Sequence, residues 1–313
     1  MSGRGRFAAD KELNTRMVLT MFLLGLLYVV AIAALIAVGV NWLPVLLVVG
    51  IFFIFQFVAS DRIALYSMKA RVVTPQQAPA LHGIVDRLCA LSDVDKPRVA
   101  VADTDVPNAF ATGRSQKKAV VCVTTGLLRR LEPDELEAVL AHELSHVAHR
   151  DVAVMTIAGF LGVLAGFITR IVLQSMMFGG YGSFGGGGGR QRSSNNDNNG
   201  GIPIVLAIIA VSAIVYAVSF VLIRTLSRYR ELSADRTAAL LTGRPSTLAS
   251  ALVKISGQMA QIPTRDLRAA EPFNAFFFTP AIAKGFSLSS LFATHPPLEQ
   301  RLAQLQRISA SMT

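Results

Sequence analysis

Residues 132–146 read EPDELEAVLAHELSH, and this stretch decides the fold. A proline at position 133 and the carboxylates of Asp134 and Glu135 are typical of the first turn of a helix. Apolar residues then recur at helical spacing. They predict a buried stripe along this helix, made of Leu136, Val139, Leu140, Leu144 and Val147.

The same helix carries a pattern that indicates a metal site. His142 and His146 are four residues apart, so both imidazoles project from one face of the helix and can bind one ion. Glu143 follows the first histidine, where its carboxylate can reach a water molecule on that ion and take its proton. The alternative interpretation is an amphipathic core helix with exposed histidines.

A catalytic zinc ion usually has three protein ligands and an open fourth position. The metzincin pattern requires glycine at position 149 and histidine at 152, and this chain has His149 and Val152, which excludes that class. The candidate third ligand lies in a helical segment that ends at Gly243, where Glu231 and Asp235 are four residues apart. One carboxylate can bind the metal while the other accepts a hydrogen bond from a ligating imidazole. An acidic pair on a solvated helix face is the alternative.

The composition indicates a membrane protein. Hydrophobic residues make up 52% of the chain, charged residues only 16%, and the mean hydropathy is +0.49. A purely cytosolic globular protein is excluded, because ordinary soluble domains are about 25% charged. The apolar segments predict four spans, at about 17–40, 44–59, 152–178 and 202–223. Residues 179–201 are rich in Gly and Asn and predict a flexible extracytoplasmic loop.

The basic residues predict the orientation of these spans. All but three of the 30 Lys and Arg residues lie in residues 1–16, 61–151 and 224–313. Four crossings place these segments on one side, which the positive-inside rule makes cytoplasmic. The net charge of +10 is then explained by topology and by attraction to anionic lipid, so a role with nucleic acid is not expected. Arg170 can snorkel, line a polar interior or end a shorter crossing.

The motif pair His142–His146 and Glu231–Asp235, with flanking spans, resembles the HtpX-type membrane zinc metalloproteases, gluzincins related to the CAAX prenyl endopeptidases. The likeness covers nearly the whole chain, including residues 107–113 and 294–297. It implies that His142, His146 and Glu231 hold one Zn²⁺ ion per chain, that Glu143 is the general base, and that Asp235 supports the ligands.

The sequence alone does not decide the roles of three further features. Residues 98–102, 108–112 and 119–123 predict short strands. The resemblance makes Asn108, Ala109 and Phe110 a substrate-binding edge strand, but an ordinary hairpin strand is equally compatible. His295 precedes two prolines and either stabilises a developing oxyanion or is a structural turn residue. His149 has no assigned role.

These observations predict a multi-pass α-helical membrane protein with a cytoplasmic α+β zincin-like domain. The expected segments are a basic N-terminus with a membrane hairpin (1–60), two catalytic segments (61–151 and 224–313), and between them two spans and the loop. The resemblance implies a zinc metalloendopeptidase of the bacterial inner membrane that cuts misfolded or damaged membrane proteins in envelope quality control. A non-proteolytic membrane scaffold with a structural metal site, or a transporter, is the alternative.

Overall fold

The computed structural model describes residues 10–37, 68–113, 115–150, 154–155, 201–259 and 295–312, with single residues at 43, 47, 50, 51, 54, 65 and 66. Most of the expected second span at 44–59 lies outside these residues. So do the expected third span at 152–178, except residues 154 and 155, and the Gly- and Asn-rich loop at 179–201, except its last residue. Arg170 is in the same gap.

The chain divides into two compact units. A helical unit contains residues 18–56 and 157–223, and a sheet unit contains residues 1–17, 57–156 and 224–313.

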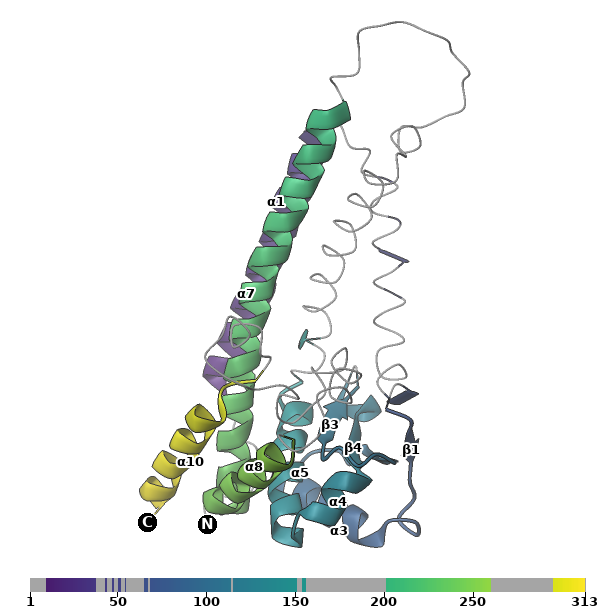
Figure 1. Cartoon of the computed structure of the whole chain (residues 1–313), viewed down its shortest axis with the longest axis vertical. Helices are drawn as coiled ribbons and strands as arrows, with labels where there is room; N and C mark the ends of the chain where they lie inside the picture. The colour runs from purple at the N-terminus through teal and green to yellow at the C-terminus, as the bar shows by residue number, and fades with distance from the viewer. Residues whose placement is uncertain are drawn as a thin grey trace, which may run out of the picture. The chain divides into compact units, whose positions relative to one another are not determined.

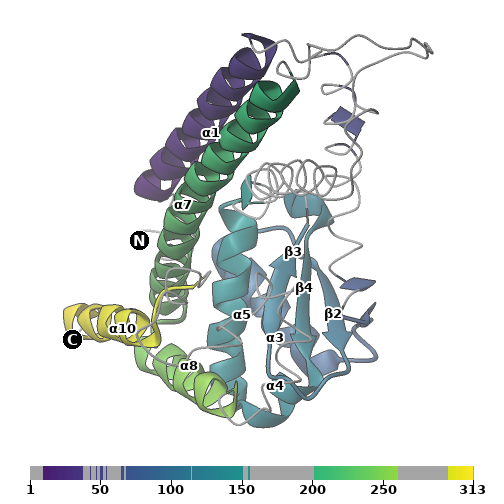
Figure 2. The same ribbon diagram turned by 45° about the horizontal axis from the view of Figure 1, so that its top comes forward.

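Among the residues that the structure describes, two helices are long and apolar enough to cross a membrane. These are α1 (Lys11–Ala37) and α7 (Gly201–Thr242), which run side by side in Figures 1 and 2. Large apolar side chains point outward from α1, with Val18 70% and Phe22 64% exposed. Outward-facing apolar side chains suit contact with lipid. The expected span at 202–223 is the first part of α7, and the helix continues beyond it into the sheet unit as far as Thr242.

The sheet unit contains a four-stranded sheet (Figure 2). Its strands are β1 (Ala70–Val72), β2 (Arg98–Ala102), β3 (Ala109–Thr112) and β4 (Val120–Thr124), in the order β1-β2-β4-β3. The β2–β4 pair is parallel and the other two pairs are antiparallel. The three strands expected from the sequence are therefore present, each within one residue of its expected bounds.

Helices pack on this sheet and on one another. They are α3 (Pro79–Ser92), α4 (Thr125–Arg130), α5 (Pro133–Ala148), α8 (Pro245–Met259) and α10 (Leu298–Met312), with a short 3-10 helix, η1 (Gln116–Lys118). α5 contacts α3, α8 and β3, and α10 packs on α8. The whole apolar stripe expected on α5 is buried in the main core. In β4, Val121 and Val123 face that core, whereas Val120 and Cys122 face a smaller cluster on the other side of the sheet.

Candidate active site

The start of α5 is held by its own side chains and by α8. Glu132 and Glu135 form a capping box, in which each side chain accepts a hydrogen bond from the backbone of the other residue. The buried Glu135 carboxylate also accepts hydrogen bonds from Ser250 (2.7 Å) and Lys254 (2.8 Å) of α8. Because these groups hold the first turn, the helix brings His142, two turns further on, to a defined position.

Three side chains from α5 and α7 converge in the interior of the sheet unit. The nearest ring nitrogens of His142 and His146, both Nε2, are 3.2 Å apart. Oxygens of Glu231 lie 3.5 Å from Nε2 of His142 and 3.6 Å from Nε2 of His146. A tetrahedral zinc site with ligand distances of about 2.1 Å has ligand atoms about 3.4 Å apart. The three donors therefore have the spacing and the chemistry of a His₂Glu zinc site.

Asp235, one turn beyond Glu231, sets the orientation of His142. Its Oδ1 lies 2.9 Å from Nδ1 of His142, and its side chain is completely buried. Because Nδ1 is directed at this carboxylate, Nε2 is the ring nitrogen that faces His146 and Glu231.

The charges of the cluster stabilise one another. Burial by itself lowers the pKa of His142, but the hydrogen bonds and charges of Asp235 and Glu231 raise it to about 9. Burial by itself raises the pKa of Glu231, but His295, His142 and His146 bring it well below its usual range. Glu231 is therefore an anion, as a metal ligand must be.

Glu143 lies beside this cluster and is 4% exposed. Burial raises the pKa of its carboxyl group to about 7, although the charge of His142 and the backbone N–H of Ala111 in β3 act in the opposite direction. A carboxylate with a pKa near neutrality can both take and return a proton at physiological pH. The position and the pKa of Glu143 therefore suit a general base.

β3 is an edge of the sheet in the described part of the chain. The backbone of Asn108, just before β3, pairs with Thr124: its N–H donates to the hydroxyl and its carbonyl accepts from the backbone N–H. Because pairing alternates along an antiparallel ladder, Phe110 also pairs with β4, whereas the backbone groups of Ala109 and Ala111 face the open edge. The contact from Ala111 to Glu143 agrees with this register. The open edge is thus presented by Ala109 and Ala111.

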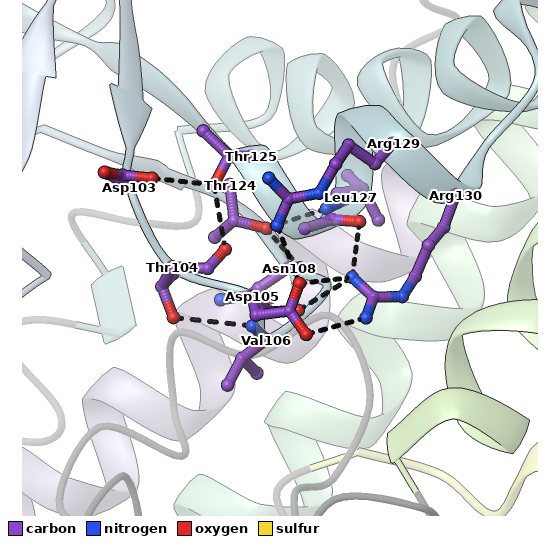
Figure 3. Close-up of polar contacts among 11 residues, drawn as sticks. Asp103, Thr104, Asp105, Val106, Asn108, Thr124, Thr125, Leu127, Arg129 and Arg130 are labelled. Atoms are coloured by element: carbon purple, nitrogen blue, oxygen red, sulfur yellow. Dashed lines mark hydrogen bonds and ion pairs between the residues drawn. The ribbon is translucent and has the colours of Figure 1, made fainter.

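The loop that leads into β3 is tied to α4 (Figure 3). Asp105 forms ion pairs with Arg129 (2.6 Å) and Arg130 (2.8 Å), and Arg130 also donates to the backbone carbonyl of Asp105. Gly126 allows the close approach, because a Cβ there would lie 2.2 Å from that carbonyl oxygen. These contacts fix where β3 begins and therefore where its edge lies relative to α5.

His295 and a cavity complete the surroundings. Nδ1 of His295 lies 2.9 Å from Oε2 of Glu231, and its buried Nε2 has no hydrogen-bond partner among the described residues. His149 is the C-cap of α5 and is not part of the ligand cluster.

A cavity of about 350 Å³ opens between the ends of β3 and α5, and its lining includes Thr112, Gly113, Gln116, His146, Val147 and Arg150.

Arg301 of α10 is the residue that sequence reasoning missed. It is 1% exposed, and its guanidinium group donates to both oxygens of Asp235. Its position in the sequence carries no signal, because an arginine on a polar amphipathic helix is ordinarily solvated.

Comparisons with known proteins agree with this site. The family model of peptidase family M48 matches residues 75–309. Among the curated relatives, Protease HtpX homolog 1 of Streptomyces coelicolor is 57% identical over 99% of this chain and 97% of its own length. Protease HtpX homolog of Moorella thermoacetica is 51% identical over 99% of this chain and 98% of its own length. A non-proteolytic scaffold is not favoured by these matches.

A solved structure shares the fold. The crystal structure of S. mikatae Ste24p aligns with a TM-score of 0.51 and 19% sequence identity, over 94% of this chain and 66% of that one. The family model, the full-length likeness to HtpX proteases and the His-His-Glu cluster lead to one conclusion. The chain belongs to peptidase family M48 and is a metalloprotease of the HtpX type.

Proposed function

We propose that the protein is a membrane-bound zinc metalloendopeptidase in which His142, His146 and Glu231 hold the ion and Glu143 is the general base. The observation that carries this proposal is the convergence of His142, His146 and Glu231, whose ligand atoms are 3.2–3.6 Å apart, with the Glu143 carboxyl group buried beside them. His₂Glu is a ligand set that suits catalytic zinc. Zinc bound there would supply a Lewis acid that polarises the scissile carbonyl group and the attacking water.

The residues of the chain supply the proton transfers. The carboxylate of Glu143 takes a proton from the attacking water and later delivers it to the nitrogen of the leaving amine. The Glu143 carboxylate is buried beside the three ligands, so one group can carry out both transfers. Nε2 of His295 can donate a hydrogen bond to the oxyanion of the transition state when the ring is an imidazolium cation, because Nδ1–H faces Glu231.

The substrate is a polypeptide in extended conformation. It adds as a strand to the open edge of β3, where the backbone groups of Ala109 and the carbonyl of Ala111 offer hydrogen bonds. The cavity beside His146 accepts one side chain of the bound segment. Binding through backbone groups has little dependence on sequence, which suits the degradation of misfolded or damaged membrane proteins.

The proposed location is a bacterial inner membrane. The apolar helices α1 and α7 support membrane insertion, and the concentration of Lys and Arg in residues 1–16, 61–151 and 224–313 supports a cytoplasmic N-terminus, catalytic domain and C-terminus. In this arrangement α7 connects a membrane span directly to Glu231.

The test is Glu143→Gln in the full-length protein purified in detergent. Casein cleavage should fall at least about 100-fold, because general base catalysis contributes on the order of 10²–10⁴. Bound zinc, measured by elemental analysis, should be unchanged because Glu143 is not a ligand. The matched control is Glu137→Gln on the same helix, whose partner is Arg87 on α3, and it should cleave normally. Persistent cleavage by Glu143→Gln would refute the proposed mechanism.

A further inference from the structure

The buried side chain of Arg301 contacts Asp235, the carboxylate that lies beside His142. Arg301 of α10 is the only lysine or arginine that is buried among the described residues. Its Nε donates to Oδ2 of Asp235 at 2.7 Å and its Nη2 donates to Oδ1 at 2.6 Å. The two hydrogen bonds hold the carboxylate in one plane and prevent its rotation about the terminal bond.

Stability alone does not explain this ion pair. Removing a guanidinium group and a carboxylate from water costs roughly several kcal/mol per ion. A protein with packed apolar residues in place of such a pair is often as stable as the protein with the pair. The ion pair therefore indicates that the site needs a carboxylate beside His142. The same Oδ1 that accepts from Arg301 lies 2.9 Å from Nδ1 of His142.

We propose that Arg301 is a positioning residue of the metal centre, which acts on His142 through Asp235 and makes the C-terminal helix α10 part of the site. Arg301 fixes the carboxylate, and the carboxylate fixes the ring so that Nε2 faces His146 and Glu231. The inference rests on the proposed metal centre. It adds a residue that lies 66 positions from Asp235, on another helix.

The geometry of the guanidinium group is the important property. Lysine would keep the positive charge but offers a single ammonium group in place of the planar pair of donors. Arg301→Lys should therefore leave Asp235 with one fixed oxygen and allow it to rotate. Arg301→Met removes both the charge and the two hydrogen bonds.

The experiment measures zinc affinity of full-length protein in detergent by competition with a chromophoric chelator. Supporting partners of metal ligands typically contribute a factor of about 10–100 in affinity. We expect Arg301→Met to bind zinc about 10–100-fold more weakly and Arg301→Lys to be intermediate. The matched control is Arg307→Met on the same helix, whose exposed side chain donates to the carbonyl of Ala303; it should bind zinc like the unmodified protein.

A double-mutant cycle distinguishes positioning from general structural support. If Arg301 acts through Asp235, adding Arg301→Met to Asp235→Asn should weaken zinc binding little beyond Asp235→Asn alone. Additive losses, or affinities of both Arg301 variants equal to that of the unmodified protein, would overturn the proposal. If Arg301→Met does not fold, the same cycle is made with Arg301→Lys. An unmodified protein that binds no zinc would instead overturn the proposed metal centre.

Discussion

The open edge of β3 leads to a prediction about the substrate. A peptide that pairs with this edge presents every second backbone N–H to Ala109 or Ala111, and the intervening N–H groups point away. N-methylation removes one N–H donor at a time without changing the side chains of the peptide. A series of peptides, each with a single N-methyl group at successive positions away from the scissile bond, therefore tests the pairing directly.

The magnitude follows from the loss of one backbone hydrogen bond. Such a bond contributes about 0.5–1.5 kcal/mol, and 1.36 kcal/mol corresponds to a tenfold change in rate. At every second position kcat/KM should fall about 2- to 12-fold, with an additional loss where the methyl group meets the edge. At the intervening positions the change should stay below about twofold.

The assay uses fluorescence-quenched peptides and detergent-purified enzyme, with the cleaved bond identified by mass spectrometry. The unmethylated peptide is the reference, and a peptide with a shifted cleavage site is excluded. Equal losses at adjacent positions, or no loss at any position, would refute binding as an added strand to β3.

Three further predictions concern stability, zinc binding and pH. Gly126→Ala should lower the free energy of unfolding by about 1–3 kcal/mol, because its Cβ would lie 2.2 Å from the carbonyl oxygen of Asp105. In the control Gly83→Ala, inside α3, the added Cβ meets nothing within 4 Å, and the free energy of unfolding should rise by about 0.5–1 kcal/mol. Equal effects of the two substitutions in thermal unfolding would contradict the close packing of Gly126 against the carbonyl oxygen of Asp105. Asp10→Ala should lower the free energy of unfolding by about 0.5–2 kcal/mol and weaken zinc binding. The reason is that Asp10 accepts hydrogen bonds from the N–H of Leu13, in the first turn of α1, and from the hydroxyl of Ser233, which lies between Glu231 and Asp235. Unchanged zinc affinity and unchanged unfolding of this variant would contradict the prediction. In metal-free protein, the raised pKa of Glu143 means that its contribution to stability is complete below about pH 4.5 and is lost as the pH rises through about 7. Between pH 5 and about 8, the free energy of unfolding measured with denaturant should therefore decline less in Glu143→Gln than in the unmodified protein. Parallel declines in the two proteins would show that the Glu143 carboxyl group does not titrate in this range.

The local parts of this protein could be predicted from its sequence. The helix of EPDELEAVLAHELSH has its capping acids, its apolar stripe and both histidines within 16 residues, and α5 runs from Pro133 to Ala148 as the pattern indicates. The strands and two apolar helices are local patterns of the same kind. Such patterns can be predicted because each depends on neighbours along the chain, whose spacing is set by the helix or strand period.

Only the tertiary structure decided how distant segments meet at the site. The amino acids around position 301 indicate an amphipathic helix, but its burial against Asp235 depends on how α10 packs in the sheet unit. Similarly, residues 108–112 predict a strand, but the choice of Ala109 and Ala111 as the outward-facing pair depends on the register with β4. Register and packing are properties of two segments together, since each hydrogen bond and buried contact needs a partner far away in the sequence.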